Sequence, residues 1–310
     1  MASEPTEFPV LTPRSAQPAQ ARHLPPWMKV KLSNGPNFLE LKDLMRSESL
    51  HTVCEEARCP NVYECWEQRT ASFLILGDTC TRNCGFCAIK TGRPTWFDLD
   101  EPRRVAETVE RMGLRHVVIT SVTRDDLDDG GASIFAGSIT AIRERVPGCG
   151  VEVLIPDLMG NWDALRVVVE ARPDSLNHNT ESVPRLYPRM RPKAKFERSM
   201  ELLRRVREMA PTMVTKSGIM VGVGETHEEI LEVFRRLREQ DCDVLTVGQY
   251  MRPDTKHLAV ERYYTPDEFA ELKREALAMG FRHVESGPLV RSSYHAASQV
   301  PPMADRVFAR

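Results

Sequence analysis

Three cysteines in one short segment are the residues of this chain best suited to chemistry. Cys80, Cys84 and Cys87 follow a C-x3-C-x2-C spacing, directly after the apolar run 72–76. Thiolates bind soft metals, and iron–sulfur clusters are usually held by four of them. Three thiolates on one loop would leave one iron of a [4Fe–4S] cluster open to an external molecule. The spacing therefore predicts a cluster with one exchangeable corner.

Other chemistries of these thiols fit less well. Structural zinc normally takes four ligands in two close pairs, and the chain has no second C-x2-C pair. Disulfides need an oxidising compartment, and three neighbouring cysteines cannot all pair with one another. Zinc and unbound thiols stay as the alternatives to an iron–sulfur cluster.

A second cysteine triplet lies upstream. Cys54, Cys59 and Cys65 follow a C-x4-C-x5-C spacing. Alone they could be core residues, because free cysteine is often buried. Beside the first triplet they predict a second cluster.

The chain resembles a known enzyme family at these motifs. The first triplet, with Phe86 before its last cysteine, resembles the radical S-adenosylmethionine (SAM) superfamily. Segments 51–61 and 291–296 are similar to the lipoyl synthase family, and the resemblance runs from about Trp27 to Ala296. Phe196 is a departure, because the family commonly has tyrosine there. The resemblance implies SAM and two [4Fe–4S] clusters as cofactors.

The resemblance also implies the reaction. Two sulfur atoms would be inserted at C6 and C8 of an octanoyl chain that is amide-linked to a lysine of a lipoyl carrier domain. Two SAM molecules would each give a 5′-deoxyadenosyl radical that abstracts one hydrogen. Such C–H bonds are too strong for side-chain acid–base chemistry, so the cofactors carry this step.

The ligands of both clusters follow from the same resemblance. The first cluster would be held by Cys80, Cys84 and Cys87, and the auxiliary cluster, the sulfur source, by Cys54, Cys59, Cys65 and Ser292. An alkoxide matches a soft cluster poorly, so the Ser292 corner would be easy to release. Arg291 belongs to the same catalytic motif, Ser293 is a possible substitute ligand, and Tyr294 and His295 are expected to pack or support.

Composition limits the protein class. The 310 residues are 41% hydrophobic, enough for one large domain or two small ones. A net charge of −2 argues against nucleic-acid binding. No apolar run approaches the roughly 18–20 residues that cross a bilayer. With eight cysteines and no secretory signal, we expect a cytoplasmic enzyme without nucleic-acid or membrane partners.

The pattern divides the chain into four segments. We expect a disordered Pro-rich tail at 1–26, an extension with the second cysteine triplet at 27–70, a barrel at 71–286 and a C-terminal segment at 287–310. Strands are expected at 72–77, 116–121, 151–155, 174–178, 213–221 and 243–248, with a weaker one at 281–285. Helices are expected at 101–112, 132–146, 161–171, 195–210, 226–240 and 266–279.

Repeated strand–helix units predict an α/β fold with a parallel sheet. Polar clusters follow each of the first six strands, as in a TIM-type barrel, whereas an open doubly wound sheet would concentrate ligands at one switch point. We therefore predict a partial (β/α)6 TIM-type barrel of the radical SAM kind, with N- and C-terminal extensions. Cys149 and Cys242 precede strands, at the opposite mouth, and are expected to be packing residues.

Residues at the strand ends are the candidates for SAM contacts. Glu181 and its neighbouring asparagines offer acceptors, with a helix-capping cluster as the alternative. The turn 218–224 could approach adenine closely or be a plain turn. The full candidate set is Phe86, Thr120, Ser121, Asn177, Asn179, Glu181, Arg191, Gly218, Met220, Gln249 and Met251.

Charged residues near these ends have two interpretations each. Asp125 and Asp126 could receive the amino group of SAM or form a solvated acidic turn. Arg191 and Lys193 could face the carboxylate or the substrate entrance, or belong to an exposed basic run.

The resemblance implies protein partners. They are octanoylated lipoyl domains of 2-oxoacid dehydrogenase E2 subunits, the glycine cleavage H protein, and a one-electron reductant such as flavodoxin or ferredoxin. A basic segment is expected to steer an acidic carrier, with a solvated helix face as the alternative. It comprises Arg185, Arg189, Arg191, Lys193 and Lys195.

Two rival functions share part of the pattern. A biotin-synthase-like or methylthio-transferring radical enzyme would share the first triplet and the barrel, but not the second triplet with segment 291–293. A non-catalytic electron carrier or zinc module would not need polar residues at six strand ends.

Overall fold

Seven parallel strands form the central sheet of the computed structural model, which describes residues 24–29, 35–47, 52 and 59–299. Within the sheet, each strand lies beside the strand that precedes it and the strand that follows it along the chain. They are β1 (Thr70–Ile75), β4 (His116–Ser121), β5 (Gly150–Leu154), β6 (Ser175–Asn177), β7 (Val214–Val221), β8 (Val244–Gln249) and β9 (His283–Gly287). The two end strands, β1 and β9, do not pair with each other, so the barrel is open. The predicted α/β barrel class is confirmed.

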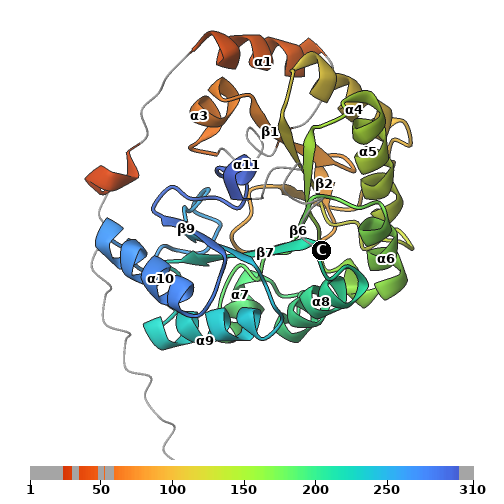
Figure 1. Ribbon diagram of the computed structural model, residues 1–310. Coiled ribbons are helices and arrows are strands. Elements are labelled where there is room, and N and C mark those ends of the chain that lie inside the picture. The colour runs from red at the N-terminus through yellow and green to blue at the C-terminus, as the bar shows by residue number, and fades with distance from the viewer. Residues whose placement is uncertain (1–23, 30–34, 48–51, 53–58, 300–310) are drawn as a thin grey trace, which may run out of the picture.

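Six helices cover the outer face of this curved sheet (Figure 1). They are α4 (Glu101–Arg111), α5 (Ala132–Arg145), α6 (Trp162–Glu170), α8 (Phe196–Met209), α9 (His227–Arg238) and α10 (Pro266–Ala278). Thr226 and Thr265 begin α9 and α10 with capping boxes, in which each hydroxyl accepts from the backbone three residues on. All six lie within two residues of the predicted bounds, because their periodic patterns are long.

Short elements complete the fold, and the sequence pattern did not predict them. The extension carries η1 (Pro26–Met28), α1 (Pro36–Ser47) and α3 (Val62–Glu67). The barrel adds β2 (Thr79–Cys80), β3 (Lys90–Thr91), η2 (Leu158–Gly160), η3 (Pro184–Leu186) and α7 (Tyr187–Met190), and α11 (Ala296–Gln299) follows β9. Most contain fewer than seven residues, too few to show a periodicity of their own.

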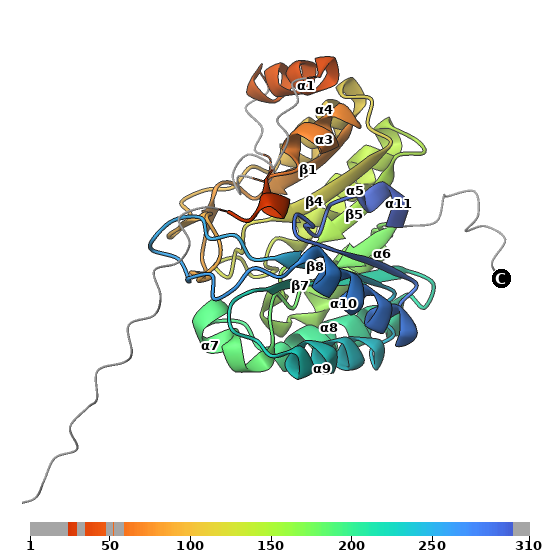
Figure 2. The same ribbon diagram turned by 90° about the vertical axis from the view of Figure 1, so that its left-hand side faces the viewer.

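The extension lies at the β1 edge of the open sheet, and β9 forms the other edge. Figures 1 and 2 show α1 and α3 near β1, and α10 beside β9. Asn61, just before α3, donates its side-chain amide to the Leu289 carbonyl at 2.7 Å. This bond links the extension to the C-terminal segment. Residues 1–23 of the predicted disordered tail lie outside the described residues.

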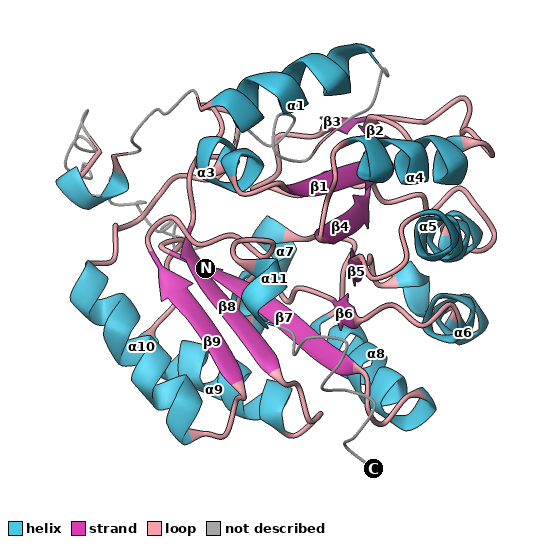
Figure 3. Ribbon diagram, turned by 45° about the horizontal axis from the view of Figure 1, so that its top comes forward, coloured by secondary structure: helices cyan, strands magenta, loops and turns pink. Residues whose placement is uncertain are grey.

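Figure 3 shows the cyan helices around the magenta strands, and most of the buried hydrophobic residues of these two layers form one core. The barrel interior also holds a buried ion pair, with Lys216 Nζ 3.0 Å from Glu152 Oε1. Cys149 and Cys242 are buried, as expected of packing residues. No helix within the described ranges is long and apolar enough to span a bilayer.

Candidate active site

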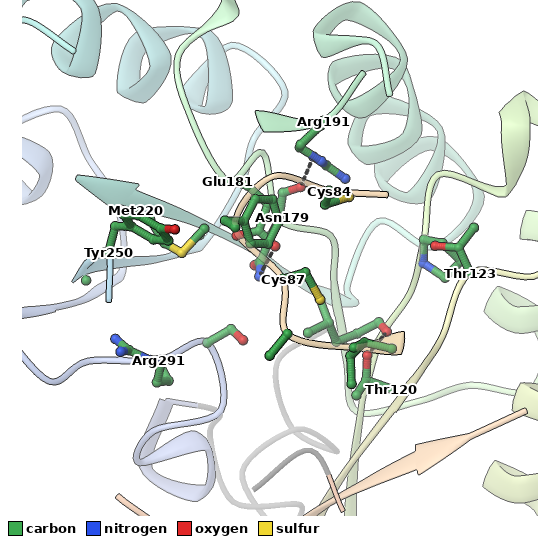
Figure 4. Close-up of a pocket in the computed structure, with 18 of the residues that line it drawn as sticks. Cys84, Cys87, Thr120, Thr123, Asn179, Glu181, Arg191, Met220, Tyr250 and Arg291 are labelled. Carbon is green, nitrogen blue, oxygen red and sulfur yellow. Dashed lines mark hydrogen bonds between the residues drawn. The ribbon is translucent and has the colours of Figure 1, made fainter. Parts of the chain in front are cut away.

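A cavity of about 460 Å³ opens at the carboxyl ends of the strands. Cys80, Cys84 and Cys87 line it together with residues that follow the strands of the sheet (Figure 4). The last contributors, Val290 to Ser292, come after β9. In a parallel barrel this mouth gathers residues from every strand, which is why distant segments meet here.

The cysteine loop is held by the end of α7 and by the loop that follows β8. The Gly85 N–H donates to the Met190 carbonyl at 2.8 Å, and the Leu258 N–H donates to the Gly85 carbonyl at 2.9 Å. A Cβ on Gly85 would lie 2.5 Å from the Arg189 carbonyl oxygen, so a side chain does not fit without a shift. His257 Nε2 lies 2.8 Å from the Cys87 carbonyl oxygen. The loop is therefore fixed before any ligand arrives.

Arg82 fixes the inner side of the same loop. Its guanidinium donates two hydrogen bonds of 2.8 Å to Asp125 and one of 2.6 Å to Asp157. Burial alone would raise the pKa of Asp157, but the hydrogen bond and charge of Arg82 hold it at about 2. Asp126 pairs with Arg124 at 2.8 Å. Neither Asp125 nor Asp126 lines the cavity, so the prediction that they receive an amino group is not supported.

The three cysteines are partly buried in the wall of the cavity. Burial raises the pKa of Cys84 to about 11 and that of Cys87 to about 12. Cys80 Sγ accepts from the Thr123 N–H at 3.3 Å and the Arg82 N–H at 3.4 Å. Thiols in this state need a bound metal centre to displace their protons. Three soft donors around one cavity fit an iron–sulfur cluster, in which each thiolate binds a different iron.

Within the part of the chain that the structure describes, no three His, Cys, Asp or Glu side chains are grouped so as to hold a single metal ion. Cys54 lies outside that part.

Glu181 and Asn179 form a polar wall of the cavity. Asn179 Nδ2 donates to Glu181 Oε1 at 3.1 Å, and Arg191 Nη1 donates to the Asn179 carbonyl at 2.8 Å. Burial raises the pKa of Glu181, and the charge of Arg191 opposes this shift. Figure 4 shows the three side chains together at one side of the cavity. They offer an acceptor and a cation to a polar ligand.

The capping alternative for Glu181 is not supported. Its φ of 64° is uncommon for a residue with a side chain and often marks a functional position. The Glu181 N–H donates to the Gly218 carbonyl at 2.9 Å, and the Met220 N–H donates to the Glu181 carbonyl at 3.0 Å. The next short helix begins after Val183, which makes no side-chain cap. Glu181 is thus held against β7 with its carboxylate toward the cavity.

Two buried polar atoms in the lining lack a partner. Asn179 Oδ1 and Ser121 Oγ have no hydrogen bond within the described ranges. Buried polar atoms are nearly always satisfied, so such a pair indicates a ligand or water that completes them.

Because Gly218 has no side chain, the part of the cavity near Asn179 stays open. A Cβ on Gly218 would lie 2.5 Å from Thr246 Oγ1 and 2.8 Å from Asn179 Oδ1. Later in the same turn, Glu225 accepts from the Gly222 N–H at 2.5 Å. That part of the turn closes on itself and does not line the cavity, so only the start of the predicted glycine turn contributes.

Nine of the eleven predicted SAM contacts line the cavity. They are Phe86, Thr120, Ser121, Asn179, Glu181, Arg191, Gly218, Met220 and Met251. Asn177 does not, because its side chain points into the buried layer near Glu152, 3.5 Å away. Gln249 does not either, because it holds its own loop, accepting from the Tyr264 N–H at 2.9 Å. Strand-end position alone does not give side-chain direction, so these two residues do not share the cavity with the other nine.

His178 and Tyr250 are among the lining residues that the sequence analysis did not predict. His178 Nδ1 lies 2.8 Å from the Ile155 carbonyl oxygen, and its Nε2 lies 2.9 Å from Ser199 Oγ. Burial lowers the pKa of His178 to about 4, so the ring is neutral at physiological pH. His178 stands within the polar strand end 177–181, and this position was the available signal.

The two described cysteines of the second triplet lie by the C-terminal motif. Burial raises the pKa of Cys59, and the nearby charge of Arg291 opposes this rise. Cys65 lies near Tyr294. Ser292 lines the same cavity as the first triplet. The fold thus brings both cysteine segments and the serine motif to one region.

The five residues of the predicted basic segment have different surroundings in the structure. Arg191 lines the cavity, and Lys193 Nζ donates to the Thr81 carbonyl at 2.9 Å. Arg185 pairs with Glu229 at 2.7 Å. Arg189 and Lys195 are exposed. Phe196 is buried edge-on against Tyr187, with 5.7 Å between ring centroids.

Comparisons with known proteins match the chain to two family models and to closely similar relatives. The model of the radical SAM superfamily matches residues 74–237, and the model of the N-terminal domain of lipoyl synthase matches residues 9–59. The lipoyl synthase of Rubrobacter xylanophilus is 58% identical over 300 residues, 94% of each chain. That of Symbiobacterium thermophilum is 60% identical over 293 residues, 94% of this chain and 91% of its own.

Solved structures share the fold at low identity. SuiB of Streptococcus suis, bound to the precursor peptide SuiA, has a TM-score of 0.54 and 11% identity, over 80% of this chain and 52% of SuiB. The hydrogenase maturase HydG of Carboxydothermus hydrogenoformans has a TM-score of 0.54 and 15% identity, over 87% of this chain and 77% of HydG. These two similarities concern the fold alone.

Proposed function

Since the chain belongs to the lipoyl synthase family of radical SAM enzymes, we propose that its cavity binds SAM beside a [4Fe–4S] cluster on Cys80, Cys84 and Cys87. We assign the auxiliary cluster to Cys54, Cys59, Cys65 and Ser292. The activity is that of the family: insertion of two sulfur atoms, at C6 and C8, into an octanoyl chain on a carrier-protein lysine.

One observation carries the residue assignment. Ser292, more than 200 residues after the first triplet, lines the same cavity as Cys84 and Cys87. A substrate in this cavity would have a SAM site on one side and the auxiliary site on the other. Sulfur transfer to a carbon from which hydrogen has just been removed requires this proximity.

The chain's own residues bind, orient and exclude water. When bound, SAM and the two clusters would supply the one-electron chemistry and the sulfur. Asn179 and Glu181 offer acceptors to the polar groups of SAM, and Arg191 offers a cation to its carboxylate. The apolar part of the lining suits an octanoyl chain and keeps water away from reactive species. It includes Leu74, Ile89, Val122, Leu154, Met220 and Val290.

The partners follow from the activity. The substrate is an octanoylated carrier protein. We propose E2 lipoyl domains and the glycine cleavage H protein as carriers, flavodoxin or ferredoxin as reductant, and a cytoplasmic location. The reducing conditions that keep free thiols available for clusters support this location. Arg189 and Lys195, exposed beside the cavity's outer loops, remain the candidates for steering an acidic carrier.

Anaerobic turnover tests the assignment. The chain is incubated with an octanoylated lysine peptide, dithionite and SAM, and the peptide is followed by mass spectrometry. We expect a mass gain from two sulfur atoms, lost in Cys59→Ala and kept in Cys149→Ala, whose thiol is buried away from the cavity. About eight irons per chain are expected from two clusters. Unchanged sulfur insertion by Cys59→Ala, or a chain that binds zinc instead of iron, contradicts the proposal.

A further inference from the structure

Glu64 lies on α3, next to Cys65 in the sequence, and contacts the C-terminal segment with both carboxylate oxygens. Tyr294 Oη donates to Glu64 Oε2 at 3.1 Å, and His295 Nε2 lies 3.4 Å from Glu64 Oε1. The Tyr294 and His295 rings stack on each other with centroids 3.8 Å apart. One carboxylate therefore holds both rings as a single block against the helix.

The backbone of His295 is held in an uncommon conformation at this contact. Its φ is 55°, in the left-handed region that few residues with a side chain adopt. Such a conformation persists only where surrounding contacts determine it. Both ring nitrogens have a carboxylate neighbour, since Nδ1 lies 3.6 Å from Glu285 Oε1 while Nε2 faces Glu64. The contacts of the ring with Glu64 and Glu285 therefore stabilise a backbone conformation that is unfavourable by itself.

A second attachment lies on the other side of Ser292. The Asn61 side chain donates to the Leu289 carbonyl at 2.7 Å. Ser292 stands between the attachment at Leu289 and the one at Tyr294. On the other segment, Asn61 and Glu64 both stand between Cys59 and Cys65. One attachment would leave the serine segment free to turn about it, whereas two fix its direction.

We propose that Glu64 is a positioning residue that holds Ser292 in register with Cys59 and Cys65, and so decides whether the auxiliary cluster is retained. This inference rests on the proposed function, in which these residues hold that cluster. A serine oxygen matches a soft cluster poorly and contributes little hold of its own. Groups behind the ligands must therefore keep it in place, as they do at many metal sites.

The test measures the iron content of each cluster. If Glu64 only supported general packing, its removal would not cause selective loss of the auxiliary cluster. Anoxically purified full-length variants are assayed for iron and sulfide and by electron paramagnetic resonance with and without SAM. In Glu64→Ala the iron content is expected to fall from about eight to about four irons per chain, while the SAM-dependent signal of the first cluster stays. Glu64→Gln keeps an acceptor oxygen for Tyr294 and is expected to retain most of the iron.

Glu67→Ala is the matched control on the same helix. Glu67 accepts from the Phe38 N–H of α1 at 3.1 Å and so contacts α1 rather than the C-terminal segment. We expect full iron content in this variant. Equal iron loss in Glu67→Ala and Glu64→Ala would reduce the effect to general packing of α3 and overturn the inference, as would wild-type iron in Glu64→Ala.

Two further variants complete the design. Cys65→Ala distinguishes a failure of the ligand assignment from a failure of the positioning role. If Cys65→Ala keeps about eight irons, the ligand assignment is wrong. If it loses about four irons while Glu64→Ala loses none, only the positioning role of Glu64 is wrong. Tyr294→Phe removes one hydroxyl and leaves the ring packing, so it decides the question if Glu64→Ala does not fold. Selective loss of auxiliary iron in Tyr294→Phe supports the inference, and unchanged iron overturns it.

Discussion

Arg82, between the first two cysteines of the loop, donates to Asp157 at 2.6 Å, and the two side chains are 5% and 0% exposed. Asp157 also accepts from Arg198 at 2.9 Å. The loop that would carry the first cluster is therefore anchored to the end of β5 by a buried charge. Replacing Asp157 removes the counter-charge of Arg198 and one of the two counter-charges of Arg82, whose pair with Asp125 stays.

Asp157→Asn is expected to destabilise the protein by about 3 kcal/mol, the low end of the usual cost of breaking a buried ion pair, because Asp125 still pairs with Arg82. The cysteine loop should loosen with it and the first cluster should be lost faster to a chelator. Urea unfolding and the rate of iron release measure the two effects. Asp100→Asn is the control, because the Asp100–Arg103 pair is exposed and should change little. Equal stability of the two variants would contradict this role of Asp157.

His178 gives the protein a dependence on pH below neutrality. Its pKa is lowered to about 4 by burial, whereas in the unfolded chain it is about 6.5. Between these values the unfolded state binds the proton and the folded state does not. Stability is therefore full above about pH 6.5 and falls as the pH drops towards 4, by up to about 3 kcal/mol.

Urea midpoints from pH 7.5 to 4.5 check this prediction. Asp157, with its pKa near 2, loses its contribution only below about pH 4, so the two effects occupy different ranges. A variant His178→Gln should show a flatter profile between pH 6.5 and 4.5. The same steep profile in this variant would assign the dependence to another group.

Gly218→Ala should weaken SAM binding and leave both clusters in place. The new Cβ would lie 2.5 Å from Thr246 Oγ1 and 2.8 Å from Asn179 Oδ1, so the polar wall must move. We expect about a tenfold rise in the Kd for SAM, equivalent to about 1.4 kcal/mol. Equilibrium dialysis of the anaerobic protein measures it. Gly137→Ala, whose Cβ would meet Pro102 Cγ at 3.2 Å and Pro102 Cβ at 3.5 Å, should bind as the wild type does.

Charge reversal at Arg189 and Lys195 should slow turnover on carrier protein at low salt. Both are exposed, so their field reaches an approaching acidic partner. We expect kcat/KM for the carrier to fall severalfold at low salt, with a smaller effect at high salt, and no change on the octanoylated peptide. Arg185→Glu is the comparison, because Glu229 already neutralises Arg185. Identical carrier kinetics in all variants would exclude steering by this segment.

Much of the fold could be predicted because its signals are local. The long helices and the seven strands each show their own periodicity, and the capping boxes at Thr226 and Thr265 lie within four residues of sequence. The short helices α3 and α11 could not be predicted in this way. They are stabilised by contacts with distant segments, as when Glu64 on α3 meets Tyr294 just before α11.

The sequence by itself determined the donor chemistry: six thiols in two spacings, a serine motif near the end, and polar residues after each strand. Only the tertiary structure decided which of those polar residues face the cavity. Asn179 does and Asn177 does not, and Asp125 is occupied by Arg82. The physical reason is that side-chain direction and charge partners depend on neighbours dozens of residues away, whereas the identity and spacing of ligands are written in consecutive residues.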